Sequence, residues 1–417
     1  MYRRIVRPYH FLVALCAALI YGFPSRNLIV IAVTGTKGKS STAELIHAML
    51  TEAGYKTALA STIHFKIAGE VKPNRYKMTM PGRFFIQRFL RDAVTEKCSY
   101  AIIEMTSEGV LQYRHKWIAL DMLVFTNISP EHIESHGSFE NYLAAKLKLR
   151  DLLEESPKKK KWMVVNGDDE YSSHFLAIEG VTKLSFSLKD AIPYNTSKRG
   201  VLLTVNGESI YSPLMGVFNI YNILAAIAVA ESQHIQITTI KQALEKCSSI
   251  EGRAERIEAG QPFTVIVDYA HTADSLQKLY SAFEESHKEG RKICVLGGTG
   301  GGRDSWKRKH MGTIADTYCS SIILTDEDPY DEDPEKIITD IREGIKKHKP
   351  KIIMDRRDAI REALAKAHKN DVVLITGKGT DPFIMGPRGK KTPWSDKAIV
   401  LEEIHALLTE KSTARKV

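Results

Sequence analysis

The sequence is poor in cysteine, and its cysteines form no pattern. It has five, an odd number, and none belongs to a CxxC pair: Cys16, Cys98, Cys247, Cys294 and Cys319. Zinc sites and small disulfide-bonded folds need closely spaced sets of cysteines. The spacing therefore argues against a disulfide framework and against a zinc site. It is typical of a protein in a reducing cytoplasm.

Features of a nucleic-acid-binding protein are also missing. The formal net charge is +9, but no basic stripe is interleaved with aromatic residues. The densest basic run, Lys158 to Lys161, follows Ser156-Pro157 and precedes the apolar stretch WMVVN, which indicates a solvated turn. We therefore expect no nucleic-acid partner, and the positive balance favours small anionic substrates.

No apolar run is long enough to cross a bilayer comfortably. The longest, FLVALCAALIYGF at positions 11–23, follows a basic start and is similar to a signal peptide. Cleavage there would leave a chain that begins almost at the loop described below. We predict an uncleaved helix that packs on the body of the protein. The alternative is a peripheral membrane contact through residues 9–23.

The 417 residues are enough for two or three domains, and short apolar runs alternate with helical patterns along most of them. Such alternation predicts an α/β protein with parallel sheets. A hairpin around Asn206-Gly207 breaks the pattern. The strand candidates are Leu28–Val33, Tyr100–Met105, Met122–Thr126, Met163–Asn166, Thr264–Asp268, Lys292–Leu296, Ser321–Thr325, Lys351–Met354 and Val372–Thr376.

The strand candidates, taken with the glycine-rich loop described next, predict a P-loop domain with a parallel sheet, followed by a Rossmann-like C-terminal α/β domain. A new series of strands and helices starts at Thr264, so a boundary is expected near Gly252. The predicted segments are an apolar helix over 1–28, a central domain over 29–252 and a C-terminal domain over 253–417.

A glycine-rich loop follows the first strand candidate. TGTKGKSS is a short form of the GxxxxGK[ST] phosphate-binding loop, between an apolar run and a helical pattern. Glycines let backbone N–H groups face a phosphate, and the following helix adds its positive end. Lys39 would reach the β- and γ-phosphates, and the Ser40 hydroxyl would ligate Mg²⁺. The alternative is a plain strand–helix turn with surface lysines. The predicted nucleotide-binding residues are Gly35, Thr36, Lys37, Gly38, Lys39, Ser40 and Ser41.

Polar side chains follow two further strand candidates. Glu104 ends one, and His132 comes shortly after the other. Ligands gather beyond the carboxyl ends of parallel strands, so Lys39, Glu104 and His132 are expected to converge there. Lys146 lies among alanines in a helical pattern, where its chemistry alone predicts an exposed lysine.

Taken together, these motifs resemble the Mur ligase family, ATP-dependent amide-forming enzymes of peptidoglycan precursor synthesis. Within it the chain is most similar to enzymes that add the third peptide residue. The resemblance runs from about Ile29 to the C-terminus. It is carried by TGTKGKSS, IEMTSEG, NISPEHIESHGSFENYLAAK, GVFNIYNILAA, EGRAERIE, VDYAHT, GGTGGGRD, TDEDPYDEDP and ITGKGTD.

The resemblance implies a mechanism. An acceptor carboxylate attacks the γ-phosphate of ATP, and an amino acid then attacks the acyl phosphate. Two Mg²⁺ ions are implied, with Ser40 and Glu104 at the first and His132 at the second. Lys146 matches the lysine that such enzymes carbamylate, because a carbamate offers Mg²⁺ hard anionic oxygens that an ammonium lacks. The implied catalytic residues are Lys39, Glu104, His132, Lys146 and Arg253.

The resemblance also implies the remaining contacts. The nucleotide would meet Asn219, Asn222, Arg253, Asp268 and His271. Acceptor and amino acid would meet Thr79, Thr106, Ser107, Arg303, Asp328, Lys378 and Asp381. Without the family pattern, helix capping would explain the two asparagines, and an interdomain salt bridge would explain Arg253 and Asp268.

The sequence departs from the family where specificity is set. The family's N-terminal UDP-binding domain has no counterpart before the phosphate loop. Glu327-Asp328-Pro329-Tyr330 replaces Asp-Asn-Pro-Arg of diaminopimelate-adding members, and Gly377–Asp381 reads GKGTD instead of GKGHE. Met78-Thr79-Met80-Pro81 replaces NTTP.

We therefore predict a cytoplasmic ATP- and Mg²⁺-dependent ligase that joins an amino acid to an anionic, muramoyl-peptide-like acceptor. The alternatives are a polyglutamate-type or amidating ligase, a P-loop kinase or nucleotidase, and a non-catalytic ATP-binding partner of a wall enzyme.

Overall fold

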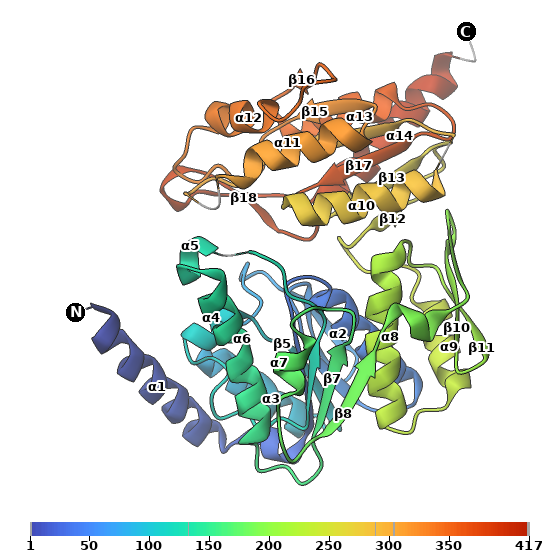
Figure 1. Cartoon of the computed structure of the whole chain (residues 1–417). Coiled ribbons are helices and arrows are strands. Elements are labelled where there is room, and N and C mark those ends of the chain that lie inside the picture. Colours follow the sequence, from blue (N-terminus) through green and yellow to red (C-terminus); the bar gives the residue numbers. More distant parts are fainter. Residues whose placement is uncertain (1, 132, 288, 303–304, 415–417) are drawn as a thin grey trace. The chain divides into compact units, whose positions relative to one another are not determined.

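The chain folds into two compact units, which Figure 1 colours along the sequence. The computed structural model describes residues 2–131, 133–287, 289–302 and 305–414. Unit 1 comprises Met1–Asn195, Val201–Pro213 and Val217–Ser248, and unit 2 comprises Thr196–Gly200, Leu214–Gly216 and Ser249–Val417. Each unit is an α/β structure with a largely parallel sheet, which confirms the predicted fold class.

Unit 1 is built on an eight-stranded sheet. Its central strand β1 pairs in parallel with β5 and β6, whereas the pairs β2–β3 and β3–β4 at one edge are antiparallel. In sheet order the strands are β4 (Glu70–Pro73), β3 (His64–Ile67), β2 (Thr57–Ala60), β5 (Tyr100–Glu104), β1 (Ile29–Thr34), β6 (Met122–Phe125), β7 (Trp162–Asn166) and β8 (Thr182–Phe186). The central strands are fully buried, as their apolar sequences predict.

Helices cover this sheet. They are α2 (Lys39–Glu52), α3 (Arg83–Thr95), α4 (Ser107–Leu111), α5 (Ile133–His136), α6 (Phe139–Glu154), α7 (Ser172–Leu176), α8 (Val217–Ser232) and α9 (Ile237–Lys246). The helix α2 packs against α8 and α9, so segments far apart in the sequence flank the glycine-rich loop.

The predicted hairpin is present as β10 (Gly200–Val205) and β11 (Glu208–Ser212), and β9 (Tyr194–Ser197) completes its sheet. Short 3₁₀ turns lie at η1 (Pro24–Asn27) and η2 (Leu188–Ala191).

The N-terminal helix α1 (Tyr2–Tyr21) packs on unit 1, as predicted (Figure 1). Its inner face buries Ala14, Ala17 and Ala18 and lies along α3. The Arg91 guanidinium of α3 donates to the carbonyl oxygen of Tyr21, where α1 ends. In the part of the chain that the structure describes, no helix combines the length and apolar character needed to cross a membrane.

Unit 2 is a six-stranded sheet in which β12 alone runs antiparallel to its neighbour. In sheet order its strands are β12 (Glu255–Ile257), β13 (Thr264–Asp268), β17 (Val372–Thr376), β14 (Lys292–Leu296), β15 (Ser321–Leu324) and β16 (Lys351–Ile352). Around it lie α10 (Ala273–Ser286), α11 (Lys307–Tyr318), α12 (Pro334–Arg342), α13 (Arg356–Lys366) and α14 (Asp396–Ala414). A small ribbon of β18 (Phe383–Met385) and β19 (Lys391–Pro393) encloses η3 (Pro387–Gly389). The helices α13 and α14 share a hydrophobic core with the strands.

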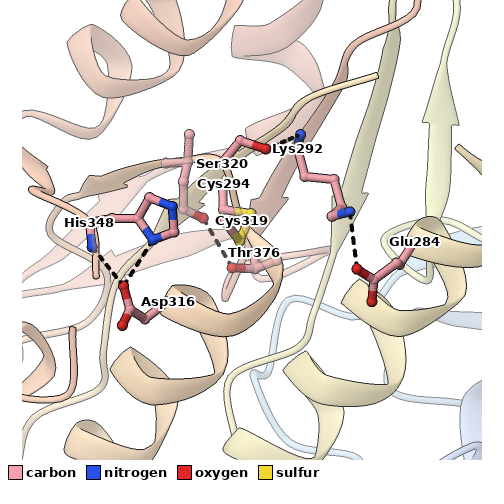
Figure 2. The surroundings of a disulfide bond; sticks show 9 residues. Glu284, Lys292, Cys294, Asp316, Cys319, Ser320, His348 and Thr376 are labelled. Carbon is pink, nitrogen blue, oxygen red and sulfur yellow. Dashed lines mark hydrogen bonds and ion pairs between the residues drawn. A yellow bond between two sulfur atoms is a disulfide. The ribbon is translucent and has the colours of Figure 1, made fainter. Parts of the chain in front are cut away.

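A disulfide joins Cys294 of β14 to Cys319 at the end of α11, so the prediction that the cysteine spacing argues against disulfides is wrong here. Figure 2 shows the bond with Thr376 nearby. The Thr376 hydroxyl donates to Val295 O at 3.0 Å. The cause is topological. Strands β14 and β15 are parallel neighbours, so the crossover through α11 brings the chain back beside its starting strand. The two Cα atoms lie 6.0 Å apart although 25 residues separate them in sequence.

Removal of this disulfide is expected to destabilise unit 2. A cross-link over a loop of this length contributes about 2–4 kcal/mol to the free energy of unfolding, so the variant Cys294→Ala/Cys319→Ala should melt at a lower temperature. Thermal unfolding with and without reductant would measure the effect, with Cys16→Ala, at an exposed free cysteine, as the matched control. An intact mass equal to that of the fully reduced chain would show that the bond does not form.

Candidate active site

The glycine-rich loop joins the central strand β1 to α2. Gly35 has φ +149°, and a Cβ there would lie 2.0 Å from Thr126 Oγ1. Gly38 has φ +82° and caps α2, and a Cβ there would lie 2.4 Å from Asn222 Oδ1. Both positions therefore require glycine, for conformation and for space. The loop passes directly into the N-terminus of α2, an arrangement that binds phosphate.

The segment after β6 holds the loop in shape. Thr36 N donates to Asn127 O at 2.8 Å, and Lys37 N donates to Asn127 Oδ1 at 2.9 Å. The Thr126 hydroxyl donates to Lys37 O at 2.7 Å. These bonds fix both sides of the turn before any ligand binds, so the loop is preorganised.

Two lysines meet the backbone of the loop. Lys39 Nζ donates to Gly35 O at 3.0 Å and to Thr36 O at 2.9 Å. Lys146 Nζ, from α6, donates to the same Gly35 O at 2.7 Å. Lys146 is 1% exposed. Burial, and then the charge of Lys39, lower the pKa of Lys146 well below its usual value. The chemistry of lysine alone predicted that Lys146 is exposed, and this prediction is wrong.

Glu104 lies at the carboxyl end of β5, beside Val33 of β1, and is completely buried. Its two carboxylate oxygens accept from Thr62 N at 2.8 Å and from Thr62 Oγ1 at 3.0 Å. The Thr62 hydroxyl also lies 2.9 Å from that of Thr79. Glu104 and Thr79, predicted as metal and substrate residues, are therefore linked through a threonine that the sequence did not single out.

The other predicted residues of unit 1 lie close by in the fold. Asn219 and Asn222 are buried inside α8 and bonded to each other at 3.0 Å, so helix capping does not explain them. Asn222 also accepts from Thr42 of α2 at 3.4 Å, which places it against the start of that helix. Thr106 caps α4 by accepting from Gly109 N, and Ser107 is buried in its first turn.

In unit 2, Asp268 organises the first predicted cluster. Its carboxylate accepts from Ala254 N at 2.5 Å and from Ala270 N at 2.6 Å, which ties β13 to the segment that carries Arg253. The Arg253 guanidinium lies over the Tyr269 ring at 4.4 Å. His271 Nδ1 lies 2.7 Å from Tyr269 O. Arg253 and His271 therefore both contact Tyr269, the residue that follows Asp268.

The second predicted cluster of unit 2 is centred on a fully buried lysine. Lys378 Nζ donates to Asp328 Oδ1 at 2.8 Å, to Phe383 O at 2.7 Å and to Asp381 Oδ2 at 3.3 Å. Glu327 lies next to this cluster, and burial raises its pKa to about 7. The three predicted residues Asp328, Lys378 and Asp381 are thus in contact, beside a carboxyl group suited to proton transfer near neutral pH.

Two predicted residues, His132 and Arg303, lie outside the described residues. Two others were not predicted. The Tyr142 hydroxyl lies 3.0 Å from Thr36 Oγ1, and Glu131 forms an ion pair with Lys37 at 2.8 Å. Tyr142 occurs in an apolar helical pattern that is typical of a core residue. The only sequence signal for a role in the site is its position four residues before Lys146.

The fold and the loop define a P-loop α/β enzyme with a second α/β unit. Residues 33–230 match the model of the Mur ligase middle domain, and residues 252–379 match that of the Mur ligase, glutamate ligase domain. A protein of Syntrophomonas wolfei named UDP-N-acetylmuramoyl-L-alanyl-D-glutamate–2,6-diaminopimelate ligase is 36% identical over 384 residues. That alignment covers 89% of this chain and 77% of the relative.

Comparison with solved structures leads to the same group of proteins. The structure of a ligase with the same name is 28% identical to this chain, with a TM-score of 0.63. The match covers 91% of this chain and 79% of that one. The structure of a folylpolyglutamate synthase of Mycobacterium tuberculosis matches with a TM-score of 0.71 at 18% identity. The match covers 88% of this chain and 92% of that one, and at this identity it supports the fold alone. The chain therefore belongs to the Mur ligase family. It is a ligase that forms carbon–nitrogen bonds, and the predictions of family and reaction class are confirmed.

Proposed function

We propose that this ligase uses ATP to join an amino acid to a carboxylate-terminated, UDP-muramoyl-peptide-like acceptor in cell-wall precursor synthesis. In this proposal residues 29–252 bind the phosphates of the nucleotide, and residues 253–417 bind the amino acid that brings the amine. The names of relatives at 36% identity support the acceptor class. The reaction is assigned to the cytoplasm, where ATP is available. The Cys294–Cys319 disulfide is compatible with that compartment because both residues are buried, away from reductants.

One observation carries the proposal. The preorganised phosphate loop and the buried Glu104 follow neighbouring strands, and the buried Lys146 donates a hydrogen bond to the backbone of the loop. Strands β5, β1 and β6 end side by side, so Glu104 and the loop lie together at the carboxyl ends of these central strands. Lys146 reaches the same place through its bond to Gly35 O. Positive charge, backbone N–H groups and a carboxylate ligand are what phosphoryl transfer requires.

The chemistry takes two steps. A carboxylate oxygen of the acceptor attacks the γ-phosphorus of ATP, and ADP leaves. The amine then attacks the acyl carbon, phosphate leaves, and the nitrogen loses a proton. Lys39 is assigned to the β- and γ-phosphates, and Asn219, Asn222, Arg253, Asp268 and His271 to the nucleotide. Thr79, Thr106 and Ser107 are assigned to the acceptor, and Asp328, Lys378 and Asp381 to the amino acid.

The donors present suit Mg²⁺. Ser40 offers a hydroxyl at the start of α2, and the Glu104 carboxylate keeps lone pairs beyond its two bonds to Thr62. Mg²⁺, when bound, offsets the charge that develops on the transferred phosphoryl group. Lys146 fits carbamylation, because its lowered pKa increases the neutral fraction of the amine, which is the form that attacks CO₂.

Product mass spectrometry tests the proposal. Purified protein, ATP and Mg²⁺ are mixed with UDP-muramoyl dipeptide and a pool of amino acids. The expected result is an acceptor heavier by one amino acid less water, only when ATP is present. Release of ADP without any gain in acceptor mass would contradict the muramoyl acceptor, and glutamyl and lipid-linked acceptors would then separate the other ligases of this fold.

We also propose that the outer face of α1 meets an anionic membrane surface. Tyr9, Leu12, Leu19 and Ile20 are each more than half exposed and follow one side of the helix. The α1 sequence YRRIVRPYHFLVALCAALIY has arginines and no acidic residue.

A sedimentation assay with vesicles that contain phosphatidylglycerol tests this contact. The double variant Leu12→Asp/Leu19→Asp should no longer sediment with the vesicles. Leu202→Asp, at an exposed leucine of β10, is the control and should still sediment. Equal sedimentation of both variants would contradict the contact.

A further inference from the structure

Unit 2 contains a second glycine-rich loop, at residues 297–302, which follows β14. The segment at residues 327–332 follows β15, the parallel neighbour of β14. Parallel neighbours have their carboxyl ends at the same end of a sheet, so the loops that follow them lie together. The second of these loops carries Asp328, a member of the predicted amino-acid cluster.

The two loops contact each other along their backbones. Gly300 N donates to Asp328 O at 2.8 Å, and Thr299 forms a parallel bridge with Asp328. The Thr299 hydroxyl donates to Glu327 Oε1 at 3.0 Å. A Cβ at Gly300 would lie 2.2 Å from Pro329 O, so this close approach requires glycine. The glycine-rich loop therefore supports the backbone of Asp328.

A buried arginine fastens this loop contact. Arg308, the second residue of α11, is 2% exposed. Its Nη1 and Nη2 donate to the two carboxylate oxygens of Glu332 at 2.6 and 2.8 Å, in a bidentate pair. Nη2 also donates to Thr299 O at 3.2 Å, and Nη1 donates to Asp340 Oδ2 of α12 at 2.9 Å. One guanidinium group thus joins the glycine-rich loop, the segment after β15 and α12.

Glu332 contacts the glycine-rich loop as well. The bonds from Arg308 lower the pKa of Glu332, although burial acts in the opposite direction, and the backbone of Gly302 forms a further hydrogen bond to its carboxylate. The bonds to Glu332 likewise raise the pKa of Arg308. Both groups are therefore charged near neutral pH. Thr299 and Gly302 are both held by the pair, so it fixes the loop on either side of Gly300.

The loop contact leads directly to the amino-acid cluster. The carbonyl oxygen of Asp328 accepts from Gly300, while its carboxylate oxygen Oδ1 accepts from Lys378 Nζ at 2.8 Å and from Met385 N at 2.8 Å. A displacement of the glycine-rich loop would therefore shift Asp328 and, with it, the ammonium of Lys378. Small displacements of binding groups have large effects on reactions that depend on the orientation of two substrates.

We propose that Arg308 and Glu332 are positioning residues for the amino-acid site. Through the glycine-rich loop they fix the backbone of Asp328, so that the Asp328 carboxylate and the Lys378 ammonium are in place before the amino acid binds. The pair acts through the loop and touches neither substrate. The effect on the amino acid rests on the proposed function, whereas the loop contact does not.

Steady-state ligation tests the effect on the site, with the amino acid that is ligated from a pool of the protein amino acids and 2,6-diaminopimelate. Arg308→Met should raise KM for that amino acid about tenfold and leave KM for ATP and for the acceptor unchanged. Arg308→Lys keeps the charge without the planar fork and should recover part of the loss.

Arg291→Met is the matched control. Arg291 pairs with the buried Asp371 at 2.7 Å, at the opposite end of β14 from the glycine-rich loop. Its loss should lower the melting temperature without changing KM for the amino acid. An equal rise of KM in Arg291→Met and Arg308→Met would overturn the positioning role, because general destabilisation would then explain both.

Hydrogen exchange tests the loop contact without any reaction. Peptides that cover residues 297–302 and 327–332 should exchange faster in Arg308→Met than in wild type, and at the wild-type rate in Arg291→Met. Glu332→Gln, which keeps the shape of the side chain, is measured in the same way if Arg308→Met does not fold. Unchanged exchange would overturn the inference. Faster exchange in a protein that ligates no amino acid of the pool would refute the proposed reaction and retain the loop contact.

Discussion

Replacement of Lys39 by alanine is expected to abolish amide formation. The Lys39 ammonium lies on the loop carbonyls of Gly35 and Thr36, where it would face the β- and γ-phosphates. Removal of a charge placed at the reacting phosphate typically lowers kcat by about 10²–10³-fold. Product mass spectrometry and ADP release, measured together, would follow the loss, and calorimetry should show that the acceptor still binds.

Lys56→Ala is the control for Lys39→Ala. Lys56 is exposed in the turn after α2, so its removal should leave turnover unchanged. Full turnover of Lys39→Ala would show that the loop does not drive the reaction. Equal losses in both variants would mean that the effect is one of overall charge.

Lys146→Ala is expected to lose activity by a comparable factor and to recover part of it with small carboxylates. The Lys146 amine is buried and its pKa lowered, so the neutral form can attack CO₂, with loss of a proton, to give a carbamate. The alanine variant lacks both the carbamate and the bond to Gly35 O. Formate or acetate would restore anionic oxygens near Glu104 and Ser40, and kcat should rise with their concentration.

Lys148→Ala provides the matched control, since it lies two residues along the same helix and is exposed. It should turn over like wild type and show no response to formate. Wild-type activity of Lys146→Ala would remove the carbamate from the mechanism. A similar melting temperature for both variants is needed to assign the loss to chemistry, because Lys146 also packs over the Tyr142 ring at 4.8 Å.

The strands that were predicted best are those buried on both faces. The bounds of β13, β14 and β17 match their predictions because parallel strands covered by helices read as continuous apolar runs. The strands β3 and β4 were not predicted. They are short, lie at the edge of the sheet, and β4 is exposed throughout, so neither an apolar run nor a clear alternation marks them.

In the candidate site, too, some residues could be predicted from the sequence and others could not. Glycines and lysines of the loop were predictable because their chemistry is local to eight residues. Thr62, Tyr142 and Glu131 were not predictable, because each contacts the site only after the chain has folded. Their bonds to Glu104, Thr36 and Lys37 join residues that are 42 to 106 positions apart in the sequence. The Cys294–Cys319 pair was missed for the same reason.

The position of the loop at the centre of the sheet bears on how easily this enzyme can be altered. Lys39, Glu104 and Lys146 are attached to buried central elements, where most substitutions damage packing. Tyr330 and Thr380, by contrast, lie in connecting segments of unit 2. Substitutions there leave the strands intact, so laboratory evolution toward new amine donors should find many tolerated routes through these segments, while the phosphoryl-transfer machinery stays fixed.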